Sequence, residues 1–238
     1  MIATAGTLRT APSFRGSRLV ASAALAFGLM VAAVALIAYY VPEDADQGLS
    51  QKIFYFHVPI ALTAYGCFGW GAWKALRHLS KRPAGADLES YVAIHMGLIF
   101  GVMTLVTGSI WARISWGVWW TWSSDQLVLF LVLFLFYSAY FMLRFSLASG
   151  PQRANVSAVY ALFGVVLIPV SFFAIRLSHD LVHPVVFNQH GPQMAGSMLL
   201  TFCVSWAALL ALASTLYRVE LAGKRIDAHL RKLKELLT

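Results

Sequence analysis

The residues best suited to bind a ligand form a dense cluster of tryptophans. The segment from Trp111 to Trp122 reads Trp-Ala-Arg-Ile-Ser-Trp-Gly-Val-Trp-Trp-Thr-Trp and holds five of the eight tryptophans of the chain. Indole rings offer large apolar faces that stack with defined geometry. The cluster therefore predicts a flat aromatic shelf for a large planar ligand. For each single ring the alternative is an anchor at the membrane interface, where tryptophan is enriched.

Histidines are the second group of residues with chemistry to offer. His57 lies near the start of an apolar run, and His179, His183 and His190 follow another such run. Neutral imidazole is a good ligand for haem iron, and two imidazoles can fill both axial positions. We predict that His57 and His183 ligate one haem that lies against the tryptophans. For each histidine taken alone, a hydrogen bond to a carbonyl or a lipid headgroup is the alternative.

Haem also carries two propionates, which basic side chains can pair with charge-assisted hydrogen bonds. Arg113, Lys52 and Arg176 each flank the tryptophan segment or a candidate iron ligand, so each is a candidate for this role. The simpler interpretation is that these side chains snorkel at the ends of membrane helices.

The composition identifies an integral membrane protein, because 59% of the 238 residues are hydrophobic and 12% are charged, outside the range of soluble domains. A helix needs about 20 residues to cross the hydrocarbon core. Six runs without Lys, Arg, Asp or Glu have about this length: Leu19–Val41, Ile53–Trp73, Tyr91–Ala112, Leu127–Leu143, Val156–Ile175 and Met194–Tyr217. The connections are short, so we predict a single all-α domain over residues 1–238, with six transmembrane helices and a tryptophan-rich loop between the third and fourth.

The basic residues are sorted along the chain. If the N-terminus is cytoplasmic, 15 of the 18 Lys and Arg residues fall in inside segments, as the positive-inside rule requires. Both termini are then cytoplasmic and the tryptophan loop is extracytoplasmic. This sorting explains the net charge of +8 without nucleic acid, for which no fold signal is present. The basic tail from Arg218 predicts a short surface helix, with a contact for another subunit as the second interpretation.

At these residues the chain resembles the CcmC proteins of the CcmC/CcsA haem-handling family. Three stretches carry the resemblance: Ile-Phe-Tyr-Phe-His-Val-Pro around His57, Val-Thr-Gly-Ser-Ile-Trp-Ala-Arg ending at Arg113, and Trp-Gly-Val-Trp-Trp-Thr-Trp from Trp116. The resemblance implies a haem b site on the extracytoplasmic side of the bacterial inner membrane. It implies that His57 and His183 are the axial ligands and that the aromatic shelf consists of Trp116, Gly117, Trp119, Trp120 and Trp122.

The resemblance also implies delivery of haem to a membrane-anchored chaperone, CcmE, alongside other cytochrome c maturation subunits. Such a protein assists covalent haem attachment on a partner and is not a classical enzyme. Two features depart from the family pattern. The family motif ends Trp-Asp, whereas here Ser123 follows Trp122 and the acid stands at Asp125. The aromatic run before the second histidine is missing, so His179 rivals His183 as the second ligand.

Two other functions fit a membrane protein with histidines. A b-type electron-transfer cytochrome would place its ligands at membrane depth, often for two stacked haems, whereas the candidate ligands here gather near one surface. A subunit of a haem transporter is the other alternative. Transporters usually carry ionisable groups near the membrane midplane, and the six apolar runs have none there.

The charge distribution yields a test of topology. Single cysteines introduced at Asp46 and Val118 should react with a membrane-impermeant thiol reagent in intact spheroplasts, because the predicted topology places both positions outside. A cysteine at Ala84 should react only after the membrane is permeabilised. Labelling at position 118 that requires permeabilisation would place the tryptophan loop in the cytoplasm and contradict the predicted orientation.

Overall fold

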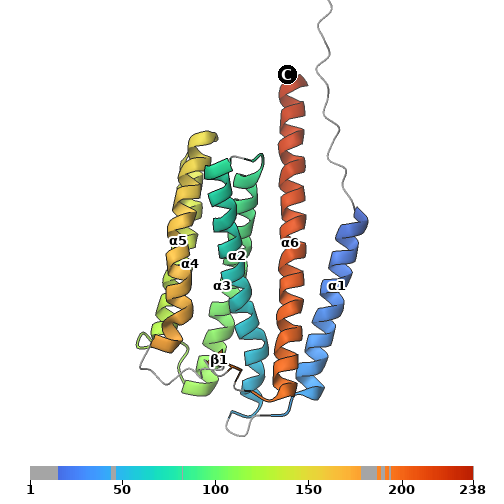
Figure 1. Cartoon of the computed structure of the whole chain (residues 1–238), viewed down its shortest axis with the longest axis vertical. Helices are drawn as coiled ribbons and strands as arrows, with labels where there is room; N and C mark the ends of the chain where they lie inside the picture. Colours follow the sequence, from blue (N-terminus) through green and yellow to red (C-terminus); the bar gives the residue numbers. More distant parts are fainter. Residues whose placement is uncertain are drawn as a thin grey trace, which may run out of the picture.

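Among the described residues, six helices are long and apolar enough to cross a membrane, as the sequence predicts (Figure 1). The computed structural model describes residues 16–43, 47–81, 83–177, 187–188, 191–192 and 194–237. The elements in chain order are α1 (Gly16–Ala35), the π-helical turn η1 (Leu36–Tyr40), the 3-10 turn η2 (Leu49–Ile53), α2 (Phe54–Lys81), α3 (Ala86–Trp116), α4 (Asp125–Ser146), α5 (Pro151–Leu177), β1 (Phe187–Asn188), β2 (Gly191–Pro192) and α6 (Gly196–Leu237). The two short strands pair antiparallel.

Helix α2 is the centre of the bundle. It packs against α3, α5 and α6, while α4 packs on α5 and α1 packs on α6. The α3–α4 connection and the strand pair lie at one end of the bundle, and the start of α1 and the end of α6 lie at the other (Figure 1). The described ends of the chain are therefore opposite the tryptophan segment, which is the arrangement that the sorting of basic residues requires.

The outer surfaces of the helices are apolar. Large hydrophobic side chains such as Val20, Phe27, Met142 and Phe163 are each more than two-thirds exposed within the isolated chain. Apolar exposure of this extent is unfavourable in water, and it matches the lipid-facing surface of helices that cross a bilayer. These side chains face lipid and are not buried by folding, so the hydrophobic effect does not hold the helices together there. Packing between the helices depends instead on the close fit of their side chains.

The interface between α2 and α3 is close because glycines face large side chains there. A Cβ atom at Gly97 would lie 2.5 Å from the ring of Phe68, and one at Gly71 would lie 2.6 Å from Cγ1 of Ile94. Phe68 in turn stacks on Tyr137 of α4, with 4.2 Å between ring centroids. Small residues let membrane helices approach one another in this way. The position of α2 along α3 is therefore tightly fixed.

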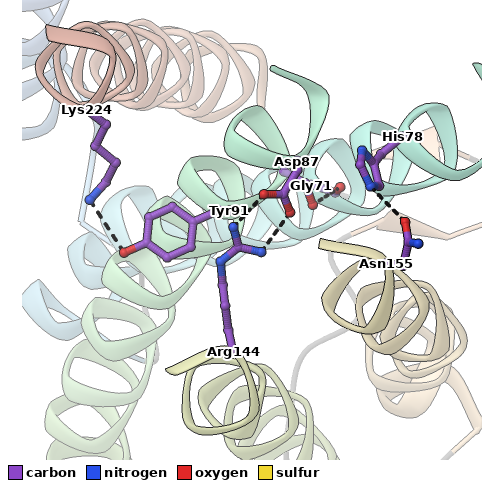
Figure 2. Close-up of polar contacts among 8 residues, drawn as sticks. Gly71, His78, Asp87, Tyr91, Arg144, Asn155 and Lys224 are labelled. Atoms are coloured by element: carbon purple, nitrogen blue, oxygen red, sulfur yellow. Dashed lines mark hydrogen bonds and ion pairs between the residues drawn. The ribbon is translucent and has the colours of Figure 1, made fainter. Parts of the chain in front are cut away.

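An ion pair joins α3 and α4 at the end of the bundle opposite the tryptophans (Figure 2). Nη1 and Nη2 of the buried Arg144 donate to the two carboxylate oxygens of Asp87 at 2.7 and 2.6 Å. The Arg144 guanidinium also lies 5.0 Å from the centroid of the Tyr91 ring. Asp87 stands in the first turn of α3, where the helix dipole favours a negative charge. The bidentate geometry ties the start of α3 to the last turn of α4.

The helices extend beyond the apolar runs that predict them, and α6 does so most. The predicted separate surface helix from Arg218 is wrong, because α6 continues without a break from Gly196 to Leu237. At 1.5 Å per residue the helix is about 63 Å long. The tail is rich in Leu, Ala, Glu, Lys and Arg, which favour helix, and Gly223 is its weakest helix former.

Candidate functional site

His57 is the fourth residue of α2, at the tryptophan end of the bundle. Its Nδ1 atom is 3.0 Å from the hydroxyl oxygen of Thr107 on α3. The Thr107 hydroxyl is also 2.8 Å from the carbonyl oxygen of Met103, one turn earlier in the same helix. Threonine commonly bonds the carbonyl four residues earlier in a helix in this way. The imidazole is thus held by a side chain whose own position is fixed by the α3 backbone.

This hydrogen-bond network assigns the tautomer of His57. The Met103 carbonyl can only accept, so the single hydroxyl proton of Thr107 is donated to it. Towards His57 the Thr107 oxygen is then an acceptor, and we infer that Nδ1 of His57 carries the proton. The lone pair then resides on Nε2. A metal-binding histidine is commonly oriented by a hydrogen bond at its other ring nitrogen, and Thr107 provides such a bond.

Gly108 makes room for the imidazole. A Cβ atom at this position would lie 2.9 Å from Cε1 of His57, closer than real side chains approach. The small residue beside Thr107 thus lets the His57 ring pass close to the α3 backbone. Thr107 and Gly108 together set both the distance and the orientation of the ring.

A small cavity lies between α2, α3 and the start of α4, and His57 lines it. Trp111, Trp116 and Trp120 line the same cavity, together with Phe130 of α4. Its volume is about 60 Å³. A water molecule needs roughly 10–15 Å³ of such space. The cavity in this form accommodates a few waters and is far too small for a porphyrin ring.

Two buried polar atoms line this cavity without a partner. Nε1 of Trp120 and Oε1 of Gln126 have no hydrogen-bond partner among the described residues, and both residues line the cavity. Buried polar atoms are usually satisfied by protein or by ordered water. Their presence beside His57 marks this cavity as a place for a ligand or for water.

A larger hollow lies on the other side of Trp120, between α3 and α4. Trp119, Trp120 and Trp122 line it with the apolar side chains of Ile110 and Leu131, and its volume is about 470 Å³. Trp120 borders both spaces. Leu105 and Ser109 of α3 also border both, so the small cavity lined by His57 and the open apolar hollow adjoin along these three residues.

The chain matches the model of the CcmC family, described as heme exporter protein C, over residues 5–235. The chain belongs to the CcmC family. It is 30% identical over 200 residues to heme exporter protein C of Paracoccus denitrificans, covering 82% of this chain and 83% of that protein. It is 29% identical over 211 residues to heme exporter protein C of Bradyrhizobium diazoefficiens, covering 88% of this chain and 78% of that protein. A putative cytochrome c biosynthesis ccmC-like mitochondrial protein of Marchantia polymorpha is 28% identical over 192 residues, covering 81% of each chain.

Two pairs of tryptophans in this CcmC-family chain meet at steep angles, so the flat shelf stays a prediction. Trp111 and Trp116 meet at an interplanar angle of 74°, and Trp120 and Trp122 meet at 71°. The rings therefore make walls at steep angles to one another. They also divide into two groups, because Trp116 and Trp120 line the cavity of His57, whereas Trp119 and Trp122 are 60% and 73% exposed.

Gly117 and Arg113 end helix α3. Gly117 has a φ of 78°, a left-handed conformation that favours glycine at a helix end, and the Arg113 side chain donates to its carbonyl oxygen. Lys52 contacts a helix end in a similar way, since its Nζ is 3.4 Å from the carbonyl oxygen of Ala38. In this structure the side chains of Arg113 and Lys52 thus contact carbonyl oxygens at helix ends. This agrees with the simpler interpretation, in which they lie at the ends of membrane helices.

The displaced acid of the CcmC-family motif begins helix α4. Asp125 is the first residue of α4, where the helix dipole favours a carboxylate. Ser123, which stands where the family pattern has the acid, shares a hydrogen bond of 2.7 Å with the Thr121 hydroxyl. The acid therefore stabilises the return of the chain into the membrane after the tryptophan loop.

Other predicted residues of the site lie outside the described part of the chain. His183, its rival His179, and His190 belong to the residues that the structure leaves undescribed. The backbone of Arg176 belongs to α5, but its side chain is not described. The second iron ligand therefore stays a prediction from the sequence.

Two histidines distant from the site have protein partners. Nε2 of His78 is 3.2 Å from Oδ1 of Asn155, which joins α2 to α5 (Figure 2). Nδ1 of His95 is 2.8 Å from a carboxylate oxygen of Glu220, which joins α3 to α6. Both contacts are those of structural histidines between helices.

Sequence reasoning assigned no role to three residues that the structure places around His57. These are Thr107, Gly108 and Gln126. The stretch Val-Thr-Gly-Ser-Ile-Trp-Ala-Arg contains the first two, so the signal was present as a motif. Trp111 lies one helical turn after Gly108, which puts both on the face of α3 that meets α2.

The assigned tautomer can be tested by nitrogen-15 NMR of histidine-labelled protein. We expect the His57 signals to be those of an Nδ1-protonated imidazole. The substitution Thr107→Val should shift them towards the Nε2-protonated form, because the valine side chain cannot accept a hydrogen bond from the Nδ1–H group. Thr104→Val is the matched control, since the Thr104 hydroxyl donates to the Phe100 carbonyl. Identical His57 signals in the wild type and Thr107→Val would show that Thr107 does not set the tautomer.

Proposed function

We propose that this chain binds haem b at the tryptophan end of the bundle and delivers it to a haem chaperone resembling CcmE, or to an apocytochrome, during c-type cytochrome maturation. The observation that carries the proposal is an imidazole that contacts Thr107 through Nδ1 and lines a cavity walled by tryptophans. The relatives named heme exporter protein C, and the plant relative named for cytochrome c biosynthesis, support the same role.

Haem is the cargo of this protein, and its size requires the site to open. A cavity of about 60 Å³ beside His57 cannot contain the macrocycle, whereas the neighbouring hollow offers about 470 Å³. We infer that the Trp120 indole swings aside and joins the two spaces. Trp120 lies in the connection between α3 and α4, and its Nε1 gives up no hydrogen bond to the described residues in doing so.

In the loaded protein His57 is one axial ligand through Nε2, and Thr107 keeps its ring in the binding orientation. His183 is the second ligand, with His179 as its rival, and either would come from the segment after α5. Two axial imidazoles give six-coordinate iron. Arg113 would pair with a propionate only after releasing the Gly117 carbonyl.

The tryptophans hold the ring by contact and not by ligation, because the indole nitrogen is a donor only. Trp111, Trp116 and Trp120 line the cavity with His57 and would contact the part of the macrocycle near the iron, while Trp119 and Trp122 would cover its outer part. Gly117 supports the site indirectly, by ending α3 where the loop must turn.

Delivery follows from this mode of binding. Axial imidazoles can be exchanged one position at a time, so an acceptor can take over the iron while the ring still lies against the tryptophans. Any covalent bond to haem forms on the acceptor, and this chain is a delivery protein. We place the site on the extracytoplasmic side of the bacterial inner membrane, because 15 of the 18 basic residues fall in the segments assigned to the cytoplasm. Other cytochrome c maturation subunits would assemble around it.

A b-type electron-transfer cytochrome is the second candidate, and the contacts of the other described membrane histidines speak against it. A second haem at membrane depth would need paired ligands there. His78 and His95 instead contact Asn155 and Glu220.

Axial ligation can be tested in purified protein reconstituted with haem. Replacing either His57 or His183 by Ala should lower haem content or convert the six-coordinate spectrum into a five-coordinate one. His229→Ala is the control, because His229 is exposed on the far end of α6. Loss of the six-coordinate spectrum in His179→Ala, with His183→Ala unaffected, would make His179 the second ligand. A wild-type spectrum for His57→Ala would contradict the proposal.

The division of the tryptophans predicts unequal effects of two double substitutions. Contact with one aromatic ring contributes about 1–3 kcal/mol. Trp116→Ala with Trp120→Ala should therefore weaken haem retention by several kcal/mol if the two terms roughly add. Trp119→Ala with Trp122→Ala should cost less, because these rings are mostly exposed. The measurement is the rate of haem loss to an apomyoglobin scavenger. Wild-type retention in the first pair would mean that these tryptophans only anchor the protein in the interface.

A further inference from the structure

Gln126 is a polar side chain in the wall of the small cavity that His57 lines. It is the second residue of α4 and follows the tryptophan loop directly. Its Oε1 atom is buried and has no hydrogen-bond partner in the described part of the chain. A buried acceptor without a hydrogen bond is costly, and buried polar atoms are normally bonded to protein or to ordered water. The Oε1 atom therefore indicates a partner inside the cavity.

Two other helices hold the Gln126 side chain in place. Its amide is hydrogen-bonded to the Tyr65 hydroxyl of α2, and that hydroxyl is 2.8 Å from Oγ of Ser171 on α5. Tyr65 and Ser171 are both buried. Since Oε1 has no partner among the described residues, the amide nitrogen is the atom that donates to Tyr65. The amide is therefore fixed between three helices, with its oxygen at the cavity.

Trp120 presents a complementary group to the same cavity. Its Nε1 can only donate a hydrogen bond, whereas Oε1 of Gln126 can only accept one. Nε1 is also buried, and the residues that the structure describes provide no acceptor for it. One donor and one acceptor that line a single cavity can share a ligand that both accepts and donates.

Water meets these requirements and haem does not. A water molecule accepts one bond from Nε1, donates one to Oε1 and keeps a second proton for another acceptor, such as the hydroxyl of Ser109, which lines the same cavity. The cavity volume of about 60 Å³ is sufficient, since a water needs roughly 10–15 Å³ of such space. The haem macrocycle does not fit, and its ionised propionates only accept hydrogen bonds, so they cannot satisfy Oε1.

We propose that Gln126 is a positioning residue that holds an ordered water against Nε1 of Trp120 and thereby keeps the indole in the wall of the cavity in the haem-free protein. The water joins the tryptophan loop to α4, and Tyr65 and Ser171 extend this link to α2 and α5. Water-mediated bonds are nearly as favourable in enthalpy as direct ones. The indole gives up this bond when it swings aside, so Gln126 slows the entry of haem. This effect on entry rests on the proposed function, whereas the bound water does not.

The bound water is tested without haem, by NMR of the full-length protein in nanodiscs with nitrogen-15-labelled tryptophan. The Trp120 indole signal, assigned with Trp120→Phe, should show a cross-peak to a long-lived water. Its proton should exchange with solvent more slowly than that of the exposed Trp122. Gln126→Met keeps the length of the side chain and removes the amide. The cross-peak should then disappear, and exchange should become about fivefold faster.

Ser138→Ala is the matched control for this measurement, because the Ser138 hydroxyl of the same helix donates to the Phe134 carbonyl and not into the cavity. Its Trp120 signal should be that of the wild type. A wild-type protein without the water cross-peak would overturn the proposal, and so would a Trp120 signal that is unchanged in Gln126→Met.

The effect on haem entry is measured by stopped-flow mixing of ferric haem with the same variants. Gln126→Met should raise the association rate about fivefold and leave the rate of haem loss to apomyoglobin nearly unchanged, because haem has already displaced the water in the loaded protein. Trp120→Phe removes the donor of the same contact, so the double variant should associate no faster than the faster single variant.

Multiplied rate increases in the double variant would mean that the two side chains act independently and would overturn the proposal. A wild-type association rate in Gln126→Met would overturn it as well. A wild-type protein that takes up no haem would contradict the proposed function, and the role of Gln126 in haem entry with it, while the bound water stands or falls on the NMR result.

Discussion

Nδ1 of His57 and the Thr107 hydroxyl are 3.0 Å apart across the interface of α2 and α3, and this hydrogen bond constrains both helices. It forms only if the two backbones approach closely, which Gly108 permits at the site itself. The same close approach recurs further along the interface, where Gly97 faces Phe68 and Gly71 faces Ile94. A larger residue at any of these glycines would separate the helices and lengthen the bond. The orientation of one imidazole therefore depends on packing along most of the length of α2.

The two ends of the bundle differ in how they are held. At one end Glu89 contacts both Lys74 at 2.7 Å and Arg225 at 3.0 Å, and Asp87 pairs with Arg144. Charge-assisted bonds of this kind fix helix ends relative to one another. At the other end the tryptophan loop contacts the helices through apolar rings, and Trp120 has an unpartnered Nε1 among the described residues. A bundle that is locked at one end can rearrange its loop at the other, as the proposed binding and delivery of haem require.

The sequence predicted the six helices because each lipid-facing run must exclude charge over about 20 residues. It did not predict where the helices end. Their last turns are polar and are held by contacts such as Asp87 with Arg144, two residues that are far apart in the chain and follow no common period. The tryptophans were predicted as a group, but their angles depend on Gly117, which puts Trp116 on a helix and Trp119 on a loop. No sequence pattern connects position 57 with position 107, so the role of Thr107 emerged only from the fold.

The central claim is that Nε2 of His57 binds haem iron, and chemical rescue tests it most directly. His57→Gly leaves a space of imidazole size against Gly108, so free imidazole can occupy the place of the missing ring. We predict that ferric haem added to the purified variant gives a five-coordinate spectrum, and that imidazole restores the six-coordinate low-spin spectrum and tight retention. The variant Thr107→Val, which keeps its own imidazole, should need no rescue. A His57→Gly protein with the wild-type thermal stability that binds haem as the wild type does without imidazole would contradict the claim.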